Sequence, residues 1–260
     1  MSKKLRLAVH KFTSCDGCQL AFINLGPDLL NLSQVVDIVH FVELGPINPE
    51  AKVDVAYVEG SISTPDDINR IQKIRSNTQY LITIGACATA GGIQALRNFS
   101  DKDAWMKAIY AKPETIDALK TSTAISHHVK VDLELWGCPV NGKQVLDVIR
   151  VLLQKTTPRV RRDSVCMECK RQGHVCVLIT KGIPCMGPVT QTGCGALCPS
   201  VGRDCYACYG PSENTNTDAL SKRFSDLGLS QPAIERRFLF INNQAPAFHQ
   251  AGLKQREKNK

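Results

Sequence analysis

The distribution of cysteine most constrains how this chain can fold. Eight of the 12 cysteines in the 260-residue sequence crowd into residues 166–208, a stretch with almost no periodic apolar pattern. Such a stretch buries little apolar surface, so we expect it to fold around cofactors that its thiolates ligate. The eight are Cys166, Cys169, Cys176, Cys185, Cys194, Cys198, Cys205 and Cys208. The other four lie far apart in the sequence and are Cys15, Cys18, Cys87 and Cys138.

Thiolates in groups of four are the ligands of [4Fe–4S] clusters, and twelve cysteines divide into three such groups. The pattern therefore predicts an electron-transfer protein. Disulfides are typical of oxidising compartments and of small domains that lack a core, whereas 260 residues are ample for a core. Structural zinc is the stronger alternative, because Cys166-x-x-Cys169 and Cys205-x-x-Cys208 have the spacing of a zinc site. Zinc does not explain why eight cysteines are packed together.

The start of the chain, its apolar runs and its net charge argue against a membrane span and a nucleic-acid partner. The start of the chain, Met1–Arg6, lacks the apolar stretch of a secretory signal, and no apolar run reaches the roughly 20 residues that span a membrane. We therefore expect a cytoplasmic protein with no membrane span. The net charge of +8 counts cysteine as neutral; twelve thiolates and three [4Fe–4S]²⁺ cores would lower it to about +2. Because aromatic residues make up only 6% and do not alternate with basic ones, we expect no nucleic-acid partner.

Residues 1–155 alternate apolar, strand-like runs with helical segments. The expected strands are residues 5–10, 35–43, 52–59, 79–85 and 129–136. The expected helices are residues 18–32 with a break at Pro27, 65–77, 102–110, 114–121 and 143–153. Near-continuous apolar strands separated by helices indicate an α/β fold, a flavodoxin-like doubly wound parallel sheet covered on both faces.

The first four cysteines follow the predicted strands. Cys15 and Cys18 come after the first strand, Cys87 after the strand ending at Gly85, and Cys138 after the last one. Carboxyl ends of parallel strands share one edge of a sheet, where such folds bind ligands, so these residues are expected to converge on one cluster. The alternative is that Cys87 and Cys138 are small, buried apolar residues. It is less favoured because the cysteines of three loops all lie at the same edge of the sheet.

A polar, basic linker at residues 155–164 separates this domain from the cysteine-rich stretch. We expect residues 156–210 to form a small, irregular iron–sulfur domain organised by its clusters. Residues 211–260 are expected to be a C-terminal extension that packs on the domains or on a partner, with a helix at residues 219–227 and an apolar run at residues 238–241.

Four motifs together resemble the small subunit of [NiFe] hydrogenases. They are Cys15-Asp-Gly-Cys18, Glu59-Gly-Ser-Ile62, Gly85-Ala-Cys87-Ala-Thr-Ala-Gly-Gly92 and Gly137-Cys138-Pro139. The resemblance covers at least residues 5–210. It implies a proximal [4Fe–4S] cluster on Cys15, Cys18, Cys87 and Cys138, facing the nickel–iron site of a separate large subunit that is an obligate partner.

The cysteine-rich stretch resembles the distal and medial sites of the same family. The resemblance is carried by Cys185-Met-Gly-Pro-x5-Cys194 and Cys205-Tyr-Ala-Cys208. It implies a distal cluster on Cys166, Cys169, Cys176 and Cys185. It implies a medial cluster on Cys194, Cys198, Cys205 and Cys208.

Two departures from the periplasmic members matter. A cysteine pair opens the distal set where those members use a histidine, and Cys198 supplies a fourth medial thiolate. Three [4Fe–4S] clusters are therefore implied, as in the cytoplasmic, sulfhydrogenase-type and viologen-reducing hydrogenases, which pass electrons to flavin, NAD(P)-linked or iron–sulfur subunits. For His174, inside the distal block, a surface role is favoured over a ligand role.

The resemblance implies an electron-relay subunit of an enzyme that oxidises H₂ or reduces protons, with its catalytic site in the partner chain. It implies a proton-handling or interface role for Glu59, for which the alternative is a solvated loop carboxylate. A complex I-type, quinone-linked relay is disfavoured because that relative has adjacent cysteines where this chain has Cys15-x-x-Cys18, and lacks the eight-cysteine block. A zinc-organised, non-redox binding module is the remaining alternative. The sequence does not identify the terminal acceptor.

Overall fold

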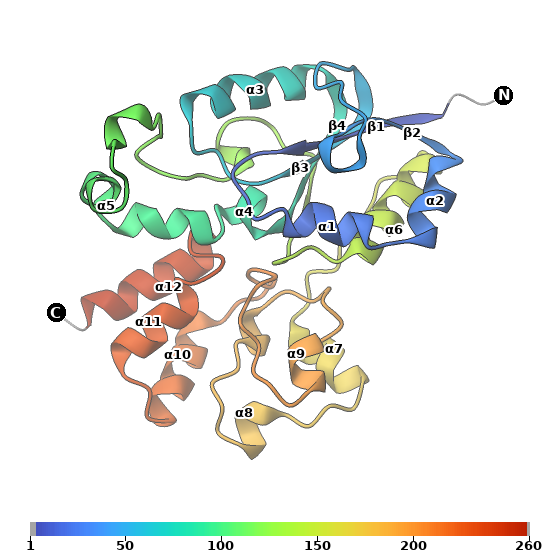
Figure 1. Ribbon diagram of the computed structural model, residues 1–260. Coiled ribbons are helices and arrows are strands. Elements are labelled where there is room, and N and C mark those ends of the chain that lie inside the picture. Colours follow the sequence, from blue (N-terminus) through green and yellow to red (C-terminus); the bar gives the residue numbers. More distant parts are fainter. Residues whose placement is uncertain (1–3, 259–260) are drawn as a thin grey trace. The chain divides into compact units, whose positions relative to one another are not determined.

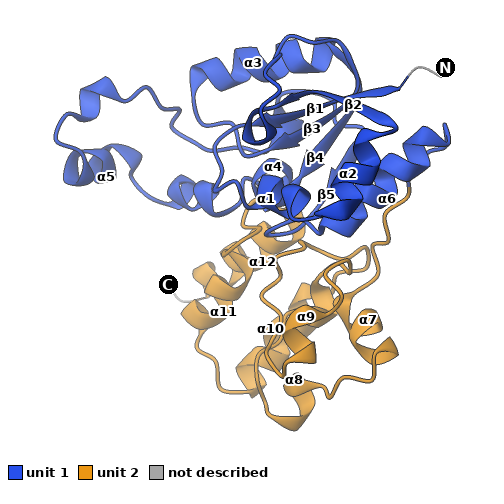
Figure 2. Cartoon of the chain, turned by 45° about the vertical axis from the view of Figure 1, so that its right-hand side comes forward, with its two compact units in different colours: residues 1–158 blue, residues 159–260 orange. Residues whose placement is uncertain are grey.

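The computed structural model describes residues 4–258, which form two compact units (Figure 2). The first unit ends at Pro158 and the second begins at Arg159, inside the linker expected at residues 155–164. A further division at residue 210 stays a prediction.

One sheet of five parallel strands, in the order β2-β1-β3-β4-β5, forms the centre of the first unit. The strands are β1 (Leu5–Lys11), β2 (Val36–Phe41), β3 (Val53–Glu59), β4 (Thr78–Ile84) and β5 (Leu133–Leu135). This is the strand order of flavodoxin-like sheets, so the predicted fold is confirmed. The register pairs Lys11 with Glu59, Glu59 with Ile84, and Ile84 with Leu135. The loops that follow these four strands therefore leave the sheet along one edge.

Helices cover both faces of the sheet (Figure 1). They are α1 (Gly17–Ile23), α2 (Pro27–Ser33), α3 (Pro65–Ser76), α4 (Gly85–Ala90), α5 (Lys102–Ile109) and α6 (Gly142–Leu153). Towards one face, α3 buries Ile71 in a cluster with Ala56 of β3. On the other face, the Tyr57 ring lies 6.0 Å from that of Phe22 in α1, and its hydroxyl donates to the Val145 carbonyl in α6 (3.4 Å). Burial on both faces explains the near-continuous apolar strands.

One predicted helix, at residues 114–121, is wrong. Only a 3₁₀ turn, Pro113–Thr115, forms there. The Leu119 N–H donates to the Ser63 carbonyl at 2.8 Å, a hydrogen bond between distant segments that overrides local helix propensity. The strand predicted at residues 129–136 is also shorter, since β5 has three residues.

The second unit is helical and irregular. Its helices are α7 (Val165–Arg171), α8 (Val177–Thr180), α9 (Leu197–Ser200), α10 (Thr217–Asp226), α11 (Gln231–Phe238) and α12 (Pro246–Glu257). The last three pack on one another, with the Phe238 and Phe248 rings 5.9 Å apart. At Gly252 a side chain would collide with Leu239, so α11 and α12 approach closely only because this residue is glycine. Helix α10 was predicted, whereas α11 and α12 were not.

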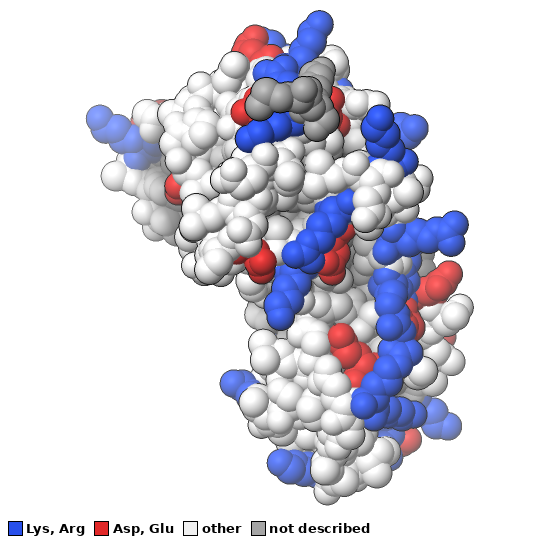
Figure 3. All heavy atoms as spheres, turned by 90° about the vertical axis from the view of Figure 1, so that its right-hand side faces the viewer, with Lys and Arg blue, Asp and Glu red and all other residues white. Residues whose placement is uncertain are grey.

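Charge on one face of the molecule is mixed rather than of one sign. On the face drawn in Figure 3, acidic side chains lie between the basic ones. In the second unit, Arg161 and Arg171 both pair with Asp163. No helix within residues 4–258 has the length and apolar character to cross a membrane.

Two buried histidines should make the first unit acid-sensitive. The His10 and His40 rings lie 4.6 Å apart, and the pKa of His10 is lowered to about 3 by burial and by the charges of His40 and Arg70. The unfolded chain binds this proton below pH 6.5 and the folded chain does not, so stability is complete above that pH and lost as pH falls. At about 1.4 kcal/mol per pH unit, one histidine accounts for roughly 2 kcal/mol between pH 6.5 and pH 5.

We therefore expect His10→Phe to reduce the acid sensitivity of the protein. The measurement compares the unfolding temperatures of the variant and the wild type at pH 7 and pH 5. The drop on acidification should be smaller for His10→Phe, and an equal drop would contradict the prediction.

Candidate metal centres

The shared edge of the sheet brings the four cysteines of the predicted proximal set together. Cys15 lies in the loop after β1, Cys18 in α1, Cys87 in α4 and Cys138 in the loop after β5. Burial, together with the thiols of Cys138 and Cys15, raises the pKa of Cys87 to about 12. Burial, Glu59 and the thiols of Cys87 and Cys138 raise the pKa of Cys18. The four sulfurs are thus near enough to influence one another.

Glycines leave the space that these sulfurs need. A Cβ on Gly85 would overlap the Cys18 sulfur, and one on Gly92 would lie 2.6 Å from Cys87 Sγ. The Val140 N–H donates to Cys18 Sγ at 3.4 Å. A thiolate cluster needs close backbone approach and N–H donors towards its sulfurs, so the residues present fit an iron–sulfur cluster.

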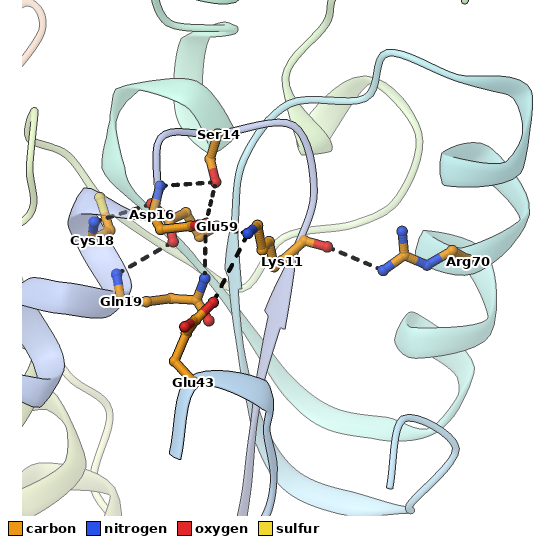
Figure 4. Close-up of polar contacts among 8 residues, drawn as sticks. All are labelled: Lys11, Ser14, Asp16, Cys18, Gln19, Glu43, Glu59 and Arg70. Carbon is orange, nitrogen blue, oxygen red and sulfur yellow. Dashed lines mark hydrogen bonds and ion pairs between the residues drawn. The ribbon is translucent and has the colours of Figure 1, made fainter. Parts of the chain in front are cut away.

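Glu59 is a structural part of this site rather than a solvated loop carboxylate. It ends β3, is only 2% exposed, and accepts the Cys18 N–H at Oε1 (3.0 Å) and the Gln19 N–H at Oε2 (3.3 Å), as Figure 4 shows. Burial raises its pKa, and these hydrogen bonds oppose the rise. The carboxylate therefore fixes the turn of α1 that carries Cys18.

Asp16, between the two ligands of the first loop, is held in place by its neighbours. Its backbone is left-handed, with φ at +64°. Lys11 pairs with its carboxylate at 2.5 Å, and Ser14 donates to it at 3.1 Å (Figure 4). This pairing balances one negative charge beside the thiols.

The predicted distal set also comes together, in the second unit. Cys166 and Cys169 lie in α7, and burial with the thiols of Cys185, Cys176 and Cys169 raises the pKa of Cys166 to about 11. A Cβ on Gly187 would lie 3.4 Å from Cys185 Sγ and 3.5 Å from Cys166 Sγ. The same combination of thiols and glycine occurs here as at the sheet edge.

His174 lies inside the distal block, and its Nε2 lies 2.6 Å from Gln172 Oε1, within hydrogen-bond distance. That His174 is a surface residue rather than a cluster ligand stays a prediction.

In the predicted medial set, the thiols of Cys205 and Cys208 are near enough to influence each other. Burial and the thiols of Cys185 and Cys208 raise the pKa of Cys205, whose sulfur accepts the Ala207 N–H at 3.4 Å. Cys194 instead has its pKa raised by burial and by the charge of Glu168. That Cys194 and Cys198 share a cluster with Cys205 stays a prediction.

In the described part of the chain, no group of three or more His, Cys, Asp or Glu side chains is placed to hold a single metal ion.

Two polar residues near the thiols could not be predicted from the sequence. The Cys87 thiol donates to Gln94 Oε1 at 3.0 Å, and Glu168 contacts the loop of Cys194. Neither lies in a recognisable motif; the only local signal is that Glu168 stands between Cys166 and Cys169.

Residues 15–152 match the family described as "NADH ubiquinone oxidoreductase, 20 Kd subunit". The chain is 35% identical over 216 residues to "Sulfhydrogenase 2 subunit delta" of Pyrococcus furiosus, covering 83% of this chain and 90% of that relative. It is 27% identical to a subunit of the F420-non-reducing hydrogenase vhu of Methanococcus voltae, covering 96% and 95% of the two chains.

Two solved structures share the fold. A chain of a NAD⁺-reducing [NiFe]-hydrogenase in the H₂-reduced state aligns with a TM-score of 0.57 at 24% identity, covering 61% of this chain and 96% of that one. A chain of the actinobacterial-type NiFe-hydrogenase of Ralstonia eutropha H16 aligns with a TM-score of 0.58 at 15% identity, covering 99% and 92%. At these identities the likeness establishes the fold.

Proposed function

The chain belongs to the NADH ubiquinone oxidoreductase 20 Kd subunit family, in which its relatives are hydrogenase subunits, and we propose that it relays electrons in a [NiFe] hydrogenase through three [4Fe–4S] clusters. The observation that carries this proposal is the convergence, at the carboxyl edge of the sheet, of four thiols from the three segments that follow β1, β4 and β5. When bound, a [4Fe–4S] cluster takes up and releases one electron. The chain's own residues hold it through thiolates, and donate N–H groups to the sulfurs.

The proposed ligands follow the three groups inferred from the sequence. The proximal ligands are Cys15, Cys18, Cys87 and Cys138. The distal ligands are Cys166, Cys169, Cys176 and Cys185. The medial ligands are Cys194, Cys198, Cys205 and Cys208. The grouping is supported for the first two sets by the mutual influence of their thiols.

The partners follow from the same proposal. The edge around residues 12–22, 59–62 and 87–92 would face a nickel-containing large subunit, because electrons must enter at the proximal site. A flavin-containing or iron–sulfur subunit would accept them beyond the distal site, and the complex would work in the cytoplasm. Glu59 would handle a proton behind this edge, because burial raises its pKa, although its hydrogen bonds from the Cys18 and Gln19 N–H groups oppose that rise.

The test is elemental analysis of the complex, isolated anaerobically through a tag on this chain. We expect about twelve acid-labile sulfides per chain, iron slightly in excess of that number, and one nickel that co-purifies with a partner. Iron and sulfide without nickel, from an intact complex, would indicate a complex I-type relay. Zinc in place of iron would refute the proposal and favour a binding module.

Gln94 should tune the proximal cluster. Once Cys87 is a thiolate it no longer donates to Gln94 Oε1, so the side-chain amide can turn its NH₂ group to the sulfur. Gln94→Leu removes this donor, and a lost hydrogen bond of about 1 kcal/mol corresponds to a potential roughly 40 mV more negative. An EPR-monitored redox titration checks this, with the other two clusters as internal controls. An unchanged proximal potential would show that Gln94 makes no such bond.

A further inference from the structure

Glu168 joins two segments that carry different groups of cysteines. It lies in α7 between Cys166 and Cys169. Its carboxylate reaches the loop that holds Cys194 and accepts three hydrogen bonds there. The donors are the Thr192 hydroxyl (2.8 Å), the Ala196 N–H (3.1 Å) and the Gly193 N–H (3.4 Å).

The bonded loop has a backbone that needs support. Ala196 is fully buried and has φ at +49°, in the left-handed region that is unfavourable for a residue with a side chain. Its N–H would also be a costly buried donor without an acceptor. The Glu168 carboxylate supplies that acceptor, so it stabilises the turn that presents the Cys194 sulfur.

The same carboxylate places a negative charge close to the Cys194 thiol. Its Oε2 accepts the N–H groups of Gly193 and Ala196, which lie on either side of Cys194 in the sequence. A fixed anion opposes the addition of an electron to a nearby cluster, because reduction adds negative charge. The charge therefore lies at the same loop that the hydrogen bonds position.

We propose that Glu168 is a positioning residue that links the distal and medial sites: it fixes the Cys194 loop from the helix of Cys166 and Cys169, and its charge lowers the reduction potential of the medial cluster. This inference rests on the proposed function, since it assumes that Cys194 ligates a cluster. It assigns the two effects to separable properties of one side chain. The hydrogen bonds need an oxygen at the Oε2 position, whereas the effect on potential needs the charge.

Two variants separate these effects. All three hydrogen bonds end on Oε2, so Glu168→Gln keeps an acceptor there and removes only the charge. Glu168→Ala removes both. Glu213→Gln is the matched control, because it removes one exposed carboxylate elsewhere in the same unit.

The experiment measures iron, sulfide and nickel in the complex isolated through this chain, followed by EPR-monitored redox titration. In Glu168→Gln we expect wild-type iron content and a medial potential more positive than in Glu213→Gln. In Glu168→Ala we expect a loss of about four of the twelve iron atoms, with the proximal signal retained. Equal medial potentials in Glu168→Gln and Glu213→Gln would overturn the inference, as would full iron content in Glu168→Ala. A wild-type complex without iron would instead refute the proposed function itself.

Discussion

Replacing Gly85 with alanine is expected to remove the proximal cluster and reduce H₂-dependent electron transfer to the background of the assay. Gly85 directly follows β4 and has φ at +84°, which alone costs alanine about 1–2 kcal/mol. The new Cβ would also overlap the Cys18 sulfur. That sulfur cannot move freely, since the Cys18 N–H is held by Glu59 and the sulfur itself accepts the Val140 N–H.

The control is Gly228→Ala. Gly228 has almost the same φ, +86°, but no atom lies within 4 Å of the position of its Cβ. It should lose about 1–2 kcal/mol of stability and keep all its iron. Iron analysis and viologen reduction with H₂ distinguish the two variants, with about four fewer iron atoms expected in Gly85→Ala alone. Full iron and activity in Gly85→Ala would show that the Cys18 sulfur does not need this space.

The parallel sheet was predictable because burial on both faces leaves a direct mark on the sequence. Residues 55–58 and 80–82 are unbroken apolar runs, as expected of strands that are covered by helices on both sides. The positions of Cys87 and Cys138 just beyond strand ends followed from the same pattern. Convergence at the sheet edge could therefore be inferred without any contact being known.

Features that depend on distant contacts were not predictable in this way. Glu168 and Thr192 are 24 residues apart, so no local pattern reveals their hydrogen bond. Helix α12 depends on Gly252 fitting against Leu239, a match of shape that composition does not show. Spacing alone also permits several divisions of the eight clustered cysteines. The proposed division came from family resemblance and stays a prediction.

Replacing Cys198 with alanine is expected to turn the medial site into a three-iron site. Cys198 lies in α9 and is the residue proposed as the fourth medial thiolate. Without it, the medial site keeps three cysteines, and the iron atom that Cys198 would hold loses its protein ligand. We expect a three-iron core to have a higher potential than a [4Fe–4S] cluster, so electrons would be trapped at the medial site. We therefore expect H₂-dependent reduction of acceptors beyond the distal site to fall, while the proximal cluster remains reducible.

Leu197→Ala is the matched control for this change. Leu197 is the neighbouring residue in α9 and is 65% exposed, so its truncation leaves the thiol in place and buries no new group. In Cys198→Ala, iron should fall by about one atom per chain, and the oxidised complex should gain an EPR signal, because [4Fe–4S]²⁺ is diamagnetic and an oxidised three-iron core is not. Leu197→Ala should show neither change. If Cys198→Ala keeps its iron and gains no new EPR signal when oxidised, Cys198 is not a ligand, and the cysteines between residues 166 and 208 must be grouped differently.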